Sequence, residues 1–138
     1  MKKSAFEKLI GEGFELLPDR VKKKVENVAF LIEDEPSEEL RKEQKLKPNE
    51  TLLGFYHGVP LSERGDYYGI GGVLPDTITL YQLPIEAEAH FLLKEGAHGR
   101  DLNEIIKHVV AETVWHEVAH HFGMDEPEVR KRESERDA

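Results

Sequence analysis

Apolar residues in the first part of the chain recur at intervals of three or four, which is the spacing of one helix face. They are Phe6, Leu9, Ile10, Phe14 and Leu17. Gly11 and Gly13 interrupt this pattern and lower its helix propensity. Pro18 then begins a second, shorter helical segment that extends to about Val25. We therefore expect two amphipathic helical segments before residue 26.

Two later segments have the pattern of strands. Residues 28–32 form a short apolar run that ends at the acidic residues 33–35 and Pro36. Residues 77–83 alternate between two bulky faces. Between them, Ser37 caps a short charged helix that ends near Lys45. Residues 47–76 are rich in Pro and Gly, so we expect only a short strand or turn near residues 52–56, followed by a loop.

The last third of the chain predicts two helices. The first begins at Pro84 and ends near Gly96, with Ile85, Ala89 and either Leu92 or Leu93 facing inward. The second begins at a cap on Asp101 and continues to His121. Its inward stripe is expected to consist of Leu102, Ile105, Val109, Thr113, His116 and His120.

The most informative residues are His116, Glu117 and His120 in this long helix. The two histidines are four residues apart, so their imidazoles point the same way and can bind one zinc ion. Glu117 lies about 100° further round the helix, where its carboxylate can reach a water molecule at the metal. The alternative is a pair of core histidines satisfied by hydrogen bonds.

Three other polar residues of this helix have less specific interpretations. His121 points about 140° away from His116, and we expect it to be structural or exposed. His108 and Glu112 lie one and two turns earlier, close to the side of the two histidines. They are candidates for orienting an imidazole, but ordinary polar positions are equally consistent with the pattern.

The residues after His120 extend the motif. Gly123 can end the helix in a left-handed conformation, and Glu126 follows three residues later. A turn at the glycine can bring a third ligand to the ion. The pattern H-E-x-x-H-x-x-G-x-x-E resembles the zincin signature that ends in His or Asp. Residues 127–138 contain no methionine, so the methionine turn of the metzincins is missing.

A closer resemblance covers most of the chain. Residues 28–36, 74–81 and 116–126 are similar to the small bacterial minimal zincins, a metallopeptidase-like family. The resemblance implies an α+β fold with a minimal zincin-like single domain, in which a small mixed sheet packs on helices and a C-terminal helix binds the metal in the floor of a cleft. It also implies an edge strand that can pair with an extended peptide. The family's third ligand is usually Asp. Spacing favours Glu126 here, and side-chain length leaves Asp125 possible.

Composition limits the number of domains, the possible metal ligands, the binding partners and the location of the protein. A chain of 138 residues is expected to be a single domain, 1–138, with a charged tail at 127–138. The absence of cysteine excludes disulfides and a thiolate zinc site. A net charge of -9 disfavours binding to nucleic acid and to anionic membranes. Without a signal-like or membrane-spanning apolar run, we expect a cytoplasmic location.

These observations lead to a zinc-dependent metallopeptidase as the first hypothesis. Zn²⁺ would be held by His116, His120 and Glu126, with Asp125 as the alternative third ligand. Glu117 would act as the general base on a zinc-activated water that hydrolyses a peptide bond of a peptide or protein substrate. Tyr67, Tyr68 and Tyr81 are candidates for stabilising the oxyanion by their chemistry alone.

Two further hypotheses remain open. One is a non-catalytic metal-binding scaffold or protein-interaction module with a zincin fold, which gains if Asp125 and Glu126 both bind zinc and complete its shell. The other is a helix that binds no metal. The sequence leaves the substrate and the oligomeric state undetermined.

Overall fold

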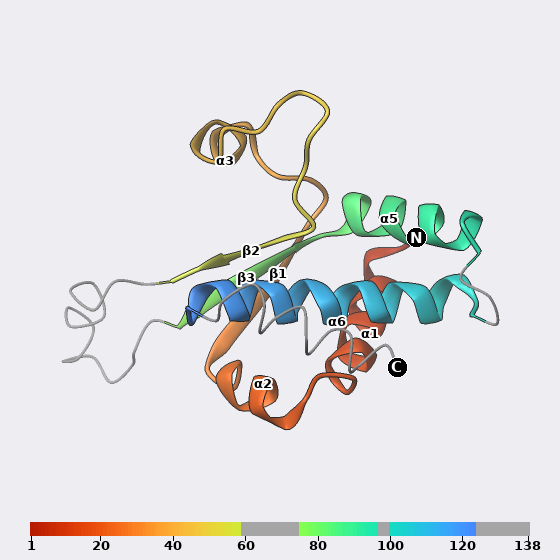
Figure 1. Ribbon diagram of the computed structural model, residues 1–138, viewed down its shortest axis with the longest axis horizontal. Coiled ribbons are helices and arrows are strands. Elements are labelled where there is room, and N and C mark those ends of the chain that lie inside the picture. Colours follow the sequence, from red (N-terminus) through yellow and green to blue (C-terminus); the bar gives the residue numbers. More distant parts are fainter. Residues whose placement is uncertain (59–74, 97–99, 124–138) are drawn as a thin grey trace.

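The computed structural model describes residues 1–58, 75–96 and 100–123, in which the chain forms five helices and one three-stranded sheet (Figure 1). The elements in chain order are α1 (Lys3–Phe14), α2 (Asp19–Lys24), β1 (Val28–Glu33), α3 (Glu38–Glu43), β2 (Gly54–His57), β3 (Asp76–Tyr81), α5 (Gln82–Lys94) and α6 (Leu102–His121). This arrangement confirms the α+β class. None of the helices in these residues has the length and apolarity needed to cross a bilayer.

The sheet is mixed and places β3 between two edge strands. β1 pairs with β3 in parallel, with Phe30 beside Ile78. β2 pairs with β3 antiparallel, with Tyr56 on the other side of Ile78. The pairing continues beyond β2, because the backbone N–H of Tyr81 donates a 2.9 Å hydrogen bond to the carbonyl of Leu53. β2 is therefore an edge strand held in register along its whole length.

Helix α6 is the centre of the hydrophobic core. It lies along the sheet, crosses α1 and runs beside α5 (Figure 1). Its buried residues meet those of the sheet and of the other helices, so several of its faces are covered at once. The largest fully buried side chains are Trp115, Phe6, Ile78, Leu80, Ile85 and Ile106. Burial of apolar surface stabilises a fold by roughly 25 cal/mol per Å². This stabilisation is concentrated around the helix that carries the histidines.

Most of the predicted elements are confirmed, and the main difference lies at the end of β3. The side chains of Ser37 and Asp101 cap α3 and α6, as expected. The predicted strand at 77–83 is too long, because Gln82 and Leu83 already belong to α5. Pro84 therefore occupies the first turn of α5, where a missing N–H costs no helical hydrogen bond.

The first helix is continuous through both glycines. Gly11 is exposed, and a methyl group at its Cα would meet nothing within 4 Å. Gly13 is buried at the crossing of α1 and α6. A Cβ there would lie 2.9 Å from the carbonyl oxygen of Lys107 and 3.3 Å from Val110 Cγ1. Gly13 therefore permits the close approach of the two helices.

We predict opposite effects of alanine at these two positions. Gly11→Ala should stabilise the fold by about 0.5–1 kcal/mol, because alanine has the higher helix propensity. Gly13→Ala should destabilise it by about 1–3 kcal/mol, because the new methyl group overlaps the backbone of α6. Urea unfolding of both variants measures the difference, and equal stabilisation by both would show that the helices do not meet at Gly13.

A second glycine sets the distance between β2 and α6. A Cβ at Gly54 would lie 2.8 Å from Thr113 Cγ2 and 3.2 Å from the carbonyl oxygen of Thr79. Thr113 is a stiff, buried side chain whose hydroxyl donates to the carbonyl of Val109 at 2.7 Å. The strand can therefore lie this close to the helix only with glycine at position 54.

We predict that Gly54→Ala destabilises the protein by about 1–3 kcal/mol and that Thr113→Ser recovers part of this loss in the double variant. Serine keeps the hydroxyl and removes the methyl group that the new Cβ would meet. A double-mutant cycle by urea denaturation measures the coupling. Strict additivity of the two substitutions would contradict the contact.

Candidate metal centre

The last two turns of α6 carry His116, Glu117 and His120 on the side of the helix that is not buried in the hydrophobic core. Val114, Trp115, Val118 and Ala119 are almost fully buried and anchor the other sides of these turns. His116 is half-buried and His120 is exposed. The stripe that the sequence predicts to face inward therefore reaches the surface at its last two positions, His116 and His120. An ion or a substrate at these two side chains would be accessible from solvent.

The two imidazoles lie one turn apart on α6 and are nearly parallel. Their ring centroids are 6.4 Å apart and the ring planes differ by 20°. Histidines four residues apart on a helix are the spacing that the zinc-binding motif uses. The chain offers nitrogen and oxygen donors but no thiolates, which is a donor set suited to zinc in a catalytic site.

A third ligand is not found among the described residues. Within 1–58, 75–96 and 100–123, no three His, Cys, Asp or Glu side chains are grouped so that they could hold a metal ion. The predicted ligands Glu126 and Asp125 lie outside the described residues, as do Tyr67 and Tyr68. Of the residues that the sequence predicts as metal ligands, the structure therefore describes only His116 and His120.

Glu117 is oriented by the edge strand. Its Oε1 accepts a 3.0 Å hydrogen bond from the backbone N–H of Tyr56 in β2. Because this N–H bonds to α6 and not to β3, it lies on the outer edge of the sheet. The bond fixes one oxygen of the carboxylate and connects two elements that are 61 residues apart. Sequence reasoning missed this partner, since a backbone donor has no signature in side-chain patterns.

Burial makes Glu117 a stronger base than an exposed glutamate. Desolvation raises the pKa of its carboxyl group above the ordinary value, and the Tyr56 N–H and the charges of His120 and His116 act in the opposite direction. A carboxylate whose pKa is raised accepts a proton more readily than an exposed one does.

A group of side chains at the end of α6 holds β2 against the helix. The ring of His121 stacks on that of Tyr56 at a centroid distance of 3.9 Å and an angle of 16°. Tyr56 Oη donates a 2.7 Å hydrogen bond to Asp76 Oδ2, which also lies 3.8 Å from His121 Nε2. We call these three residues the Tyr56 clamp. The interpretation of His121 as a structural residue agrees with this contact.

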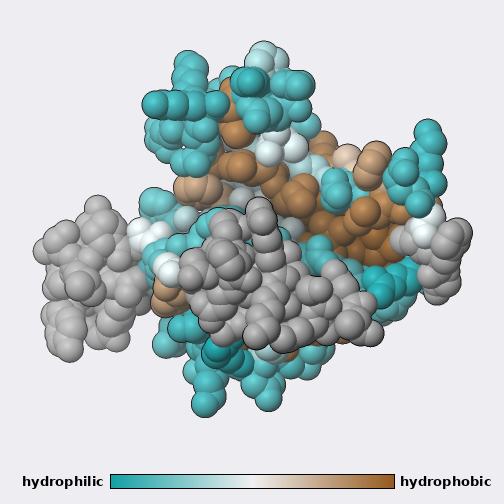
Figure 2. Space-filling model, viewed as in Figure 1, coloured by the Kyte–Doolittle hydropathy of each residue, from teal (hydrophilic) through white to brown (hydrophobic). Residues whose placement is uncertain are grey.

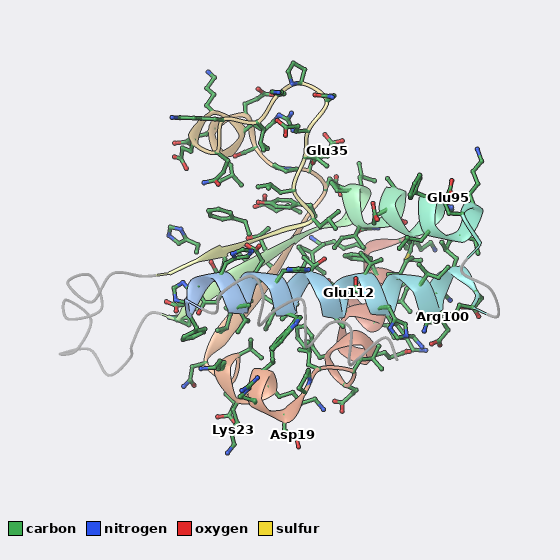
Figure 3. The ribbon with its side chains drawn as sticks, in the orientation of Figure 1. Asp19, Lys23, Glu35, Glu95, Arg100 and Glu112 are labelled. Atoms are coloured by element: carbon green, nitrogen blue, oxygen red, sulfur yellow. The ribbon has the colours of Figure 1, made fainter. Side chains whose placement is uncertain are left out.

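The other polar candidates occupy less specific positions. Tyr81 is buried, and desolvation with the nearby charges of Glu33 and Glu117 raises the pKa of its phenol to about 12. The phenol is therefore protonated at neutral pH and can only donate a proton in a hydrogen bond to an anion. His108 and Glu112 are half-buried on α6, and Figure 3 shows Glu112 in the middle part of this helix.

A solved structure and a protein-family model are similar to this chain. One similar solved structure is a conserved hypothetical protein from T. thermophilus, which is 24% identical. The match covers 88% of this chain and 94% of that one, with a TM-score of 0.47. No curated protein sequence matches significantly. The model of the zincin-like metallopeptidases matches residues 25–136, and the chain therefore belongs to the zincin-like metallopeptidase family.

Proposed function

We propose that this protein is a zinc-dependent metallopeptidase that hydrolyses peptide bonds with Glu117 as its general base. The observation that carries the proposal is the combination of two nearly parallel imidazoles with a half-buried carboxylate held by the edge strand. Membership of the zincin-like family supports the same chemistry. The match of the family model extends through residues 125 and 126, where the proposal places the third ligand.

In this proposal His116, His120 and either Glu126 or Asp125 hold the ion. When bound, zinc would lower the pKa of water and polarise the carbonyl of the scissile bond. Glu117 takes a proton from the attacking water and then delivers it to the leaving nitrogen as the C–N bond breaks. The Tyr56 N–H keeps the carboxylate oriented through both transfers, so the base does not have to be reordered between them.

We further propose that the substrate is an extended peptide or protein segment. β2 is an edge strand next to Glu117, and an extended chain can add to such an edge through main-chain hydrogen bonds at the outward groups that Glu117 does not occupy. Such binding is tolerant of side chains, so specificity would have to come from the side chains around the cleft. The net charge of -9 argues against a nucleic-acid substrate.

We predict that Glu117→Gln retains zinc and loses peptidase turnover by at least about a hundredfold, since general-base catalysis contributes about 10²–10⁴. His116→Ala and His120→Ala should lose the metal itself. Metal analysis of each purified variant and turnover of a peptide library measure the two effects separately. Glu39→Gln, an equivalent change in the exposed part of α3, is the matched control and should alter neither quantity.

The same experiment separates the alternatives. Equal turnover in wild type and Glu117→Gln would refute the proposed mechanism. Stoichiometric zinc without turnover in the wild type would favour the metal-binding scaffold. Alanine substitutions of Asp125 and Glu126, made singly and together, identify the third ligand by which of them lowers zinc affinity.

We predict that the Tyr56 clamp positions Glu117 through β2. His121→Ala removes the stack and should speed hydrogen exchange of the Tyr56 amide, whereas His121→Phe keeps a flat ring and should preserve its protection. Turnover should fall in the alanine variant while zinc affinity stays unchanged. Unaltered exchange of the Tyr56 amide in His121→Ala would contradict this role, whatever the effect on activity.

A further inference from the structure

The strand β2 and the last turns of α6 run side by side in a fixed register. The close approaches between them follow one another at equal intervals and join Gly54 with Thr113, Tyr56 with Glu117, and Gly58 with His121. Two residues of a strand cover about 6.6 Å and four residues of a helix about 6.0 Å, so the two intervals match. β2 therefore runs parallel to α6, and each position along the strand corresponds to a known level of the helix.

Glu112 lies one turn before His116 on the same side of α6, in the middle part of the helix (Figure 3). Its side chain is half-buried. In the register with β2 it lies at the level of Gly54, since Thr113 is the next residue. The midpoint of His116 and His120 is about 9 Å further along the helix axis, and an extended chain covers this distance in about three residues. A substrate extended along β2 therefore has a side chain near Glu112 two or three residues from the bond at the metal site.

The elements that surround the proposed site contain acids but neither lysine nor arginine. In β2, in β3 and in residues 108–123, the carboxylates are those of Asp76, Glu112 and Glu117. Glu117 is the proposed base, and Asp76 accepts the hydrogen bond from Tyr56 in the Tyr56 clamp. Glu112 is thus the one carboxylate of the three that has neither of these roles. The net charge of -9 gives the whole chain the same sign and attracts cationic segments over longer distances.

The charge changes sign at the other end of this region. Lys24 Nζ lies over the ring of Phe122, 4.4 Å from its centroid. Phe122 follows the last residue of α6 and is two residues beyond His120. The negative charge of Glu112 and the positive charge of Lys24 are therefore on opposite sides of the two histidines along the helix axis. A basic substrate residue is favoured only on the side of Glu112, which is the side toward the start of β2.

We propose that the protein acts on peptide segments that carry Lys or Arg two or three residues from the scissile bond, on the side toward the start of β2, and that Glu112 determines this preference. The inference rests on the proposed peptidase function and names the substrate class of the same site. A carboxylate binds an ammonium or guanidinium group through charge-assisted hydrogen bonds. Because Glu112 is half-buried, salt screens this attraction less than it screens a fully exposed pair.

The position of the basic residue also reports the direction of the substrate. A substrate strand antiparallel to β2 would place this residue after the scissile bond. A parallel strand would place it before the bond.

The test uses short peptides, capped at both ends, that differ only in placing Lys, Gln or Glu at one position two or three residues from the central bond. Binding is measured to the Glu117→Gln variant in the presence of zinc, and turnover is measured with the wild type. We expect the Lys peptides to bind about fivefold more tightly than the Glu peptides, which is the upper end of the range for an exposed ion pair. In the Glu117→Gln background, Glu112→Gln should remove this ratio and Glu112→Lys should invert it.

Glu39→Lys is the matched control, because it changes the net charge by the same amount as Glu112→Lys. Glu39 belongs to α3, which stands away from the sheet and from α6 in Figure 1 and is mostly hydrophilic in Figure 2. This control should leave the ratio of the Lys and Glu peptides unchanged. Circular dichroism verifies that each variant is folded.

The outcomes for this inference and for the proposed function are distinct. Equal affinity for the Lys and Glu peptides, absence of binding to any peptide, or a preference that survives in Glu112→Gln would overturn the role of Glu112. An equal loss of the preference in Glu39→Lys would assign it to net charge alone and would also overturn this role. A wild type that binds the Lys peptides preferentially but cleaves none would refute the peptidase function and support the subsite. A wild type that cleaves the Lys and Glu peptides equally well would do the reverse.

Discussion

The hydrogen bond between the Tyr56 N–H and Glu117 is the contact on which the proposed site depends. It joins the outer edge of the sheet to the helix that carries both histidines. A carboxylate on an isolated helix would rotate freely and stay well solvated. Here the edge strand both orients the group and removes water from it, and this burial raises its pKa. The orientation of this carboxylate is therefore a property of the packing between β2 and α6.

That packing in turn depends on small residues at two crossings. Gly54 lets β2 lie directly on Thr113 of α6, and Gly13 lets α1 approach the backbone of the same helix. Helix α6 is thus fixed from two sides while its buried residues, Trp115 among them, fill the space between. A close-packed interior transmits small displacements, so each glycine affects the site from a distance. This explains why a chain of modest size can hold a base in one orientation.

The surface has regions of different character. The end of α6 and the edge of β2 form the region proposed for a substrate, whereas the outward side of α5 exposes apolar side chains, among them Leu83 and Phe91. The exposed apolar side chains of α5 have no role in the core, in which the opposite side of that helix is already engaged through Ile85 and Ala89.

The sequence by itself determined the capped helix up to His121 and the placement of His116, Glu117 and His120 on it, because periodicity and fixed spacing encode helix faces directly. Its resemblance to the minimal zincins implied the α+β class that the structure confirms. The strand predicted at residues 77–83 was too long, since the alternation of these residues continues beyond Tyr81, where packing turns the chain into α5. The tertiary structure alone decided which backbone amide orients Glu117 and which ring stacks on Tyr56. Those contacts join residues far apart in the chain, and a backbone donor looks the same at every position of a sequence.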